Sequence, residues 1–192
     1  SIVNKAKRIA GLIRRTTCRL VANNVMVKLF ETLVRSHLEY CSQLWAPFTL
    51  EDIILIEKVQ RRYTKSLLPH LSYKERLLYL RLLPLSYRRE INDILFFFKG
   101  YYGVCHIDFN RFVSEVESSR LRSGSNGTLY IAKRFRTVTF QRSYFQRAVQ
   151  LWNALPFNTK TCGNFVSFRR EFYQAKLVNN FDPNNTHTWV SF

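Results

Sequence analysis

The sequence predicts a mostly α-helical protein: a basic helical bundle, an irregular segment with short strands, and a smaller helical C-terminal part. Apolar residues recur every three or four positions along most of the chain, and proline, glycine and capping residues separate these runs. A composition that is 46% apolar and 15% aromatic indicates a folded core. We expect the bundle at 1–103, a linker with short strands at 104–140, the helical part at 141–178 and an irregular tail at 179–192.

The first two helices of the bundle follow from side-chain periodicity. In the first, Ile2, Ala6, Ile9 and Ile13 share one face, beside a basic row of Lys5, Arg8, Arg15 and Arg19. The second begins after a short break, where Asn23 or Asn24 is suited to cap it. Its broad apolar surface predicts the most buried element of the N-terminal half.

The stretch 34–62 is the centre of the predicted bundle. Pro47 cannot continue a helix, so the preceding helix should end near 44–46. Thr49 is placed to cap the next helix, with Asp52 three residues later. That helix combines an apolar stripe with a basic face made of Lys58, Arg61, Arg62 and Lys65.

Further start and stop signals divide the rest of the bundle. Ser72 and Glu75 form a complete capping-box pattern, and Pro84 ends the short helix that they begin. Ser86 is suited to cap a helix that ends at Gly100 and Gly103.

The C-terminal third is less regular at first and then helical again. Residues 128–140 are β-branched and aromatic, which is typical of an extended segment or a short hairpin. A helix should follow and end at Pro156, and Asn164 should cap a last one. Helical spacing favours a core position for Phe98, Phe145, Trp152, Phe165 and Phe168. Trp45, just before Pro47, is compatible with a side chain that packs over the end of the helix, a packing plug, or with one that contacts a ligand.

The net charge of +17 makes nucleic acid the default partner, because a polyanion relieves the self-repulsion of so many cations. We expect the basic faces to line a groove along the sugar-phosphate backbone. The expected binding residues are Lys5, Arg8, Arg15, Lys58, Arg61, Arg62, Lys65, Arg88, Arg89 and Tyr63. Tyr63, Tyr87, Tyr101 and Tyr102 are candidates for stacking on unpaired bases. An anionic membrane surface and a protein-interaction scaffold are the alternatives.

Cysteine and apolar patterning favour an intracellular protein without a metal site. Cys18, Cys41, Cys105 and Cys162 form no Cys-x-x-Cys pair, and the histidines lie at no persuasive zinc-ligand spacing. Reduced, mostly buried thiols are the simpler interpretation. The longest apolar run, at 94–98, is too short to span a bilayer, and we expect the nucleus and cytoplasm.

Several sequence motifs occur in a fixed order along the chain. They are VRSHLEYCSQLWAP at 34–47, IEKVQRR at 56–62, LSYKERL at 71–77, LPLSYRR at 83–89, SYFQRAVQLWNALP at 143–156 and FVSFRREF at 165–172. This series resembles the region downstream of the polymerase domain in non-LTR (LINE-type) retrotransposon reverse transcriptases, in particular the jockey and chicken-repeat branches. Ser36 stands where that family usually has proline.

The resemblance implies a thumb-like and post-thumb segment that grips template and primer beside a catalytic palm. Its expected partners are RNA and DNA, as a template–primer duplex, and an upstream palm in the same polypeptide. Two-metal nucleotidyl transfer needs converging aspartates, and this sequence has no Asp-Asp pair, so Mg²⁺ is expected only in the palm. We expect no catalysis by this chain alone and no cofactor in it. A degenerate or domesticated element remnant is the corresponding form of the scaffold alternative.

Overall fold

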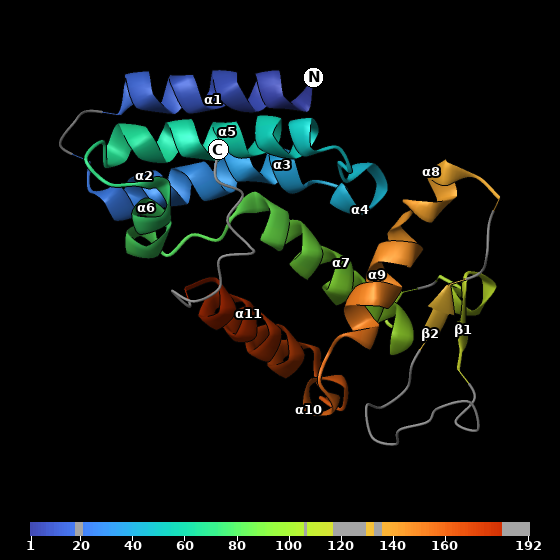
Figure 1. Ribbon diagram of the computed structural model, residues 1–192. Helices are drawn as coiled ribbons and strands as arrows, with labels where there is room; N and C mark the ends of the chain where they lie inside the picture. The colour runs from blue at the N-terminus through green and yellow to red at the C-terminus, as the bar shows by residue number, and fades with distance from the viewer. Residues whose placement is uncertain (18–20, 106, 117–129, 133–135, 182–192) are drawn as a thin grey trace. The chain divides into compact units, whose positions relative to one another are not determined.

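The structure is a computed structural model (Figure 1) that is mostly helical, as predicted. It describes residues 1–17, 21–105, 107–116, 130–132 and 136–181, with the backbone alone for 175–181. The chain divides into two compact units, Ser1–Arg89 and Glu90–Phe192. This division lies inside helix α7 (Leu85–Tyr101), earlier than the predicted limit at 103, because Leu85 packs in the core of the first unit and later turns of α7 pack in the second.

Unit 1 consists of helices. They are α1 (Ile2–Thr16), α2 (Asn23–Leu29), the π-helical η1 (Phe30–Arg35), α3 (Ser36–Glu39), α4 (Ser42–Trp45), α5 (Leu50–Leu67) and α6 (Tyr73–Leu80). The elements α2, η1 and α3 follow one another without a break. The helix predicted to reach 44–46 is interrupted earlier, where Cys41 takes a left-handed conformation with φ of 52°. Trp45 follows that turn, and its Nε1 donates to the Tyr40 carbonyl at 2.7 Å, which agrees with a packing plug.

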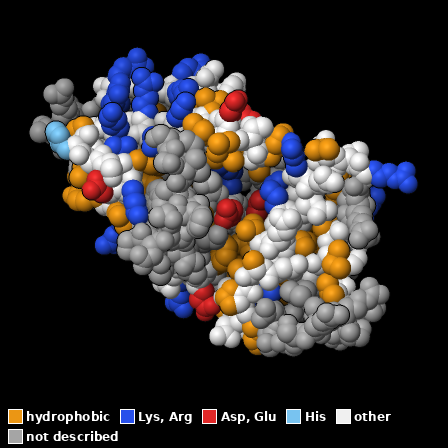
Figure 2. Space-filling view, viewed as in Figure 1, with side chains coloured by type: hydrophobic (Ala, Val, Ile, Leu, Met, Phe, Trp, Pro, Cys, Tyr) orange, Lys and Arg blue, Asp and Glu red, His pale blue; other side chains and the backbone are white. Residues whose placement is uncertain are grey.

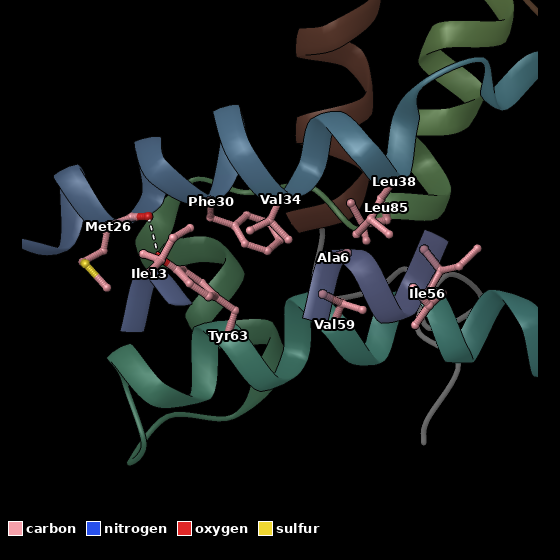
Figure 3. Close-up of a cluster of buried hydrophobic side chains, with 11 residues drawn as sticks. Ala6, Ile13, Met26, Phe30, Val34, Leu38, Ile56, Val59, Tyr63 and Leu85 are labelled. Atoms are coloured by element: carbon pink, nitrogen blue, oxygen red, sulfur yellow. Dashed lines mark hydrogen bonds between the residues drawn. The ribbon is translucent and has the colours of Figure 1, made fainter. Parts of the chain in front are cut away.

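The core of unit 1 lies between the α2–η1–α3 segment and the pair α1 and α5 (Figure 3). Phe30, Val34 and Leu38 are completely buried, as expected for the most buried element of this half. They pack with apolar residues of α1 and α5, namely Val3, Ala6, Ile13, Ile56, Val59 and Tyr63. This shared core fixes α1 and α5 beside each other (Figure 1).

Two predicted helix starts are confirmed by their hydrogen bonds. The Thr49 side chain accepts from the Asp52 amide at 3.3 Å. At α6, Ser72 Oγ accepts from the Glu75 amide at 3.4 Å, while the Glu75 carboxylate accepts from the Ser72 amide at 2.7 Å. The prediction for α2 is wrong, since this helix begins at Asn23 and its cap residue, Ala22, offers no side-chain acceptor.

Unit 2 combines helices with one small sheet. Beyond the first turn of α7 its elements are η2 (Phe109–Arg111), β1 (Val113–Glu115), β2 (Tyr130–Ala132), α8 (Val138–Gln141), α9 (Tyr144–Asn153), α10 (Phe157–Lys160) and α11 (Phe165–Phe181). The strands are antiparallel, with Ser114 opposite Ile131. Of the run 128–140 that was predicted to be extended, 130–132 forms β2, 138–140 belongs to α8, and 128–129 and 133–135 lie outside the described residues. Helix α11 continues past 179, where an irregular tail was predicted, and the remainder, 182–192, lies outside the described residues.

Aromatic side chains form the core of unit 2. The ring centroids of Phe97 and Trp152 are 5.2 Å apart, and Phe98 stacks on Phe168 with a centroid distance of 4.2 Å. Phe98, Trp152 and Phe168 are almost completely buried, which confirms their predicted core role. Phe145 and Phe165 are half-buried at the margin of the same cluster.

Candidate nucleic-acid interface

A groove rich in cations runs between α1 and α5 in unit 1. It has a volume of about 220 Å³ and is lined by Lys7, Ala10, Gly11, Arg14, Lys58, Val59, Arg62, Tyr63 and Ser66. Lys7 and Arg14 are two helical turns apart on α1, and Lys58 and Arg62 are one turn apart on α5, so each pair lies on one side of its helix. Figure 2 shows Lys and Arg side chains gathered over these helices.

A second, larger hollow of about 590 Å³ adjoins the first at the junction of α5 and α6. Its lining residues are Lys7, Lys58, Arg61, Arg62, Lys65, Pro69, Leu71, Tyr73 and Arg76. Because Lys7, Lys58 and Arg62 line both hollows, we treat the two as one basic groove. Its cationic side chains are Lys7 and Arg14 of α1, Lys58, Arg61, Arg62 and Lys65 of α5, and Arg76 of α6.

Arg76 and Arg61 are arranged around the aromatic ring of Tyr73. Arg76 is buried, and it donates from Nη1 to the Leu71 carbonyl at 2.7 Å and from Nε to Thr64 Oγ1 at 3.3 Å. The guanidinium carbons of Arg61 and Arg76 lie 4.8 and 5.5 Å from the centroid of the Tyr73 ring. These cation–π contacts hold two like charges close together in one wall of the groove.

A buried polar network fixes Tyr73 from beneath. The Tyr73 hydroxyl donates to the Glu57 carboxylate and accepts from Gln60 Nε2 at 3.2 Å. The same carboxylate accepts from the Leu85 amide at 2.9 Å, and Gln60 also donates to the Leu83 carbonyl at 3.0 Å. Burial raises the pKa of Glu57 and, together with the neighbouring carboxylate, that of Tyr73. The side of the groove that Tyr73 forms is therefore connected by hydrogen bonds to buried residues of unit 1.

Three lysines of the groove have no acidic partner among the described residues. The Glu31 and Glu39 carboxylates form ion pairs with residues outside the groove, namely Lys28, Arg35 and Arg88. Lys7, Lys58 and Lys65 are exposed and form no ion pair with any described acidic side chain. A bound polyanion would relieve the repulsion among these uncompensated charges.

The predicted basic face of α5 lies together in this groove, with all four of its members, Lys58, Arg61, Arg62 and Lys65, among the lining residues. The predicted row on α1 does not: Lys5, Arg8 and Arg15 are exposed but line neither hollow.

The residues that sequence reasoning missed are Lys7, Arg14 and Arg76. The signal that was present for α1 is helical spacing, because Lys7 and Arg14 share a face of the helix with Ala10, which packs against the core of unit 1.

Three other predicted binding residues need correction. Tyr63 is only 4% exposed, and its hydroxyl donates to the Met26 carbonyl at 2.8 Å, so its ring belongs to the core and is not open to a base (Figure 3). Arg88 makes a two-point contact with the Glu39 carboxylate, with Nη2 at 2.9 Å from one oxygen. Arg89 is buried. Both arginines lie in the first turns of α7, the part of this helix that belongs to unit 1.

Tyr101 and Tyr102 are partly exposed in unit 2, at 39% and 40%, and their stacking on bases stays a prediction, as does that of Tyr87. Cys41, Cys105 and Cys162 are free thiols. In the described part of the chain, no group of three or more His, Cys, Asp or Glu side chains is arranged to hold a metal ion, and no helix is long and apolar enough to cross a membrane.

Comparisons of the chain with protein-family models, with curated proteins and with solved structures give no match.

Proposed function

We propose that this chain is a non-catalytic nucleic-acid-binding segment of an RNA-directed DNA polymerase of the non-LTR retrotransposon type, and that its basic groove grips the template–primer backbone. The observation that carries the proposal is the convergence of cations from three helices, α1, α5 and α6, on one groove. The ordered motifs from 34–47 to 165–172 support the choice of family.

The groove would act by electrostatic and steric positioning. Exposed lysines neutralise phosphates as mobile point charges, whereas Arg62 can contact two phosphate oxygens at once. Contacts of this kind fix the register and orientation of a duplex and carry no base information. The buried hydrogen bonds of Tyr73 with Glu57 and Gln60 keep the α5 and α6 cations in position before the ligand binds.

A specific observation also favours a protein contact in unit 1. Large apolar side chains around α4 are highly exposed, with Tyr40 at 76%, Leu44 at 87% and Phe48 at 61%. Such a patch suits contact with another folded domain. In the proposed setting that domain is the upstream palm, and in the scaffold alternative it is an unrelated protein.

The test measures binding of the purified chain to an RNA–DNA hybrid, duplex DNA, single-stranded RNA and anionic lipid vesicles over a salt series. Nucleic-acid affinity should fall linearly with salt on a log–log plot, with a slope of about −0.9 per phosphate contacted on duplex DNA. Preference for vesicles at every salt concentration, or binding that does not respond to salt, would contradict the proposal.

Matched variants separate the groove from general surface charge. Lys7→Gln and Arg14→Gln remove groove cations, and Lys5→Gln and Arg15→Gln remove exposed cations of the same helix outside it. Each groove variant should bring the slope closer to zero by about 0.9, and each control should change it much less. Equal losses in both pairs would mean that binding depends on net charge alone.

A further inference from the structure

The hollow between α5 and α6, here called the α5–α6 pocket, gathers more cations than contact with a single backbone phosphate of a nucleic acid requires. Its lining includes six cationic side chains, those of Lys7, Lys58, Arg61, Arg62, Lys65 and Arg76, around one aromatic ring. The turn between the two helices adds Pro69 and Leu71 to the same lining. Cations here surround one hollow, whereas those of the α1–α5 hollow follow two helices side by side.

The pocket is organised before any ligand binds. Arg76 is 6% exposed and is held by Leu71 and Thr64, so its position does not depend on a ligand. Arg61 shares the Tyr73 ring with it. Burial lowers the pKa of Arg76, the nearby Tyr73 acts against this, and the charge of Arg61 adds a smaller lowering. An anion between them would offset that repulsion.

We infer that the α5–α6 pocket binds a phosphate group with about two negative charges, as found at the phosphorylated end of a nucleic-acid strand. A phosphomonoester carries about −1.5 to −2 charges at neutral pH and presents three strong acceptor oxygens. An internal phosphodiester carries one charge and is served by the α1–α5 hollow. This inference rests on the proposed function and adds to it a preference for strand ends, and a free oligophosphate shares the same chemistry.

The test compares one single-stranded oligonucleotide in three forms: unphosphorylated, 5′-phosphorylated and 3′-phosphorylated. With the full chain, one phosphorylated form should bind about tenfold more tightly, because the extra charge faces several cations at short range. Lys65→Gln changes a residue that lines only this pocket, and it should remove most of the preference. Arg14→Gln changes a residue that lines only the α1–α5 hollow, and it should weaken all three forms alike. Both residues are exposed, and circular dichroism verifies folding.

Inorganic pyrophosphate separates the two sources of phosphate. Displacement of the oligonucleotide by pyrophosphate, stronger than by sodium chloride of equal ionic strength and lost in Lys65→Gln, identifies a free oligophosphate as a ligand. Strand-end preference without such displacement identifies the nucleic-acid terminus. The inference is overturned if neither phosphorylated form is preferred and pyrophosphate acts only as a salt. In that case salt-dependent binding of all three forms leaves the proposed function standing, whereas absence of binding refutes both.

Discussion

Replacing Tyr63 by phenylalanine removes one buried hydroxyl and leaves the ring in place. The ring is 4% exposed and lies 4.7 Å from the ring of Phe30, so the packing of the core is preserved. The lost interaction is the 2.8 Å hydrogen bond to the Met26 carbonyl. That carbonyl keeps its helical bond from the Phe30 amide, so it is not left without a donor. The free energy of unfolding should fall by about 1 kcal/mol.

The assay is urea unfolding of the whole chain followed by circular dichroism. Burial raises the pKa of Tyr63 to about 12, so the hydroxyl stays protonated and the loss should be the same from mildly acidic to mildly alkaline pH. Tyr79→Phe is the matched control, because that side chain is 67% exposed and should contribute almost nothing.

Tyr63→Leu distinguishes the core position from a base-stacking role. As a core residue, Tyr63 should lose about 2–3 kcal/mol of stability on this change while affinity for single-stranded RNA stays constant in the folded variant. A stacking residue would instead lose about 1–3 kcal/mol of binding free energy per base, with stability little changed. The second result would refute the placement of this ring in the core.

Two further predictions concern backbone packing and pH. Gly100→Ala should destabilise unit 2 by about 1–3 kcal/mol, because a Cβ there would overlap the ring of Phe109. Gly11→Ala meets open space and should stabilise α1 by about 0.5–1 kcal/mol. Thermal unfolding of both variants tests this, and equal shifts in the two unfolding temperatures would contradict it. Burial raises the pKa of Glu57 above its ordinary 4.5, although hydrogen bonds from Tyr73 and a backbone amide act against this. The folded state therefore holds the Glu57 proton more tightly than the unfolded state does. Stability relative to Glu57→Gln is fully present below the ordinary pKa of Glu57 and is lost as pH rises through the raised pKa of the folded protein. The slope of this loss is at most about 1.4 kcal/mol per pH unit. Urea unfolding of both proteins across this range measures it, and a difference that grows with pH would refute the sign.

Two helix caps that depend on near neighbours in the sequence were predicted correctly. The caps at Thr49 and at Ser72 with Glu75 are set by side chains three residues apart, and the structure has both. Core positions such as Phe98 and Trp152 follow from helical spacing alone. Where the local signal was weaker the prediction failed, as at Cys41, where the chain turns before the proline that was expected to end the helix.

The candidate site was only half predicted, because it depends on how helices are rotated against one another. The basic face of α5 was visible in the sequence, since its four cations lie within three turns of one helix. Which cations of α1 face it depends on the rotation of α1 about its axis, and packing of Ala6 and Ile13 in the core sets that rotation. That packing brings Lys7 and Arg14 into the groove and leaves Lys5 outside it.

The sequence by itself determined that this chain is a helical, strongly basic protein with buried aromatic cores, because helix formation, capping and net charge follow from residue type and local spacing. Tertiary structure alone decided which charges act together. It placed Arg76 beside Arg61 across Tyr73, and it paired Arg88 with Glu39. Electrostatic interactions depend on distance in space, and that distance is fixed only when the apolar faces of separate helices pack.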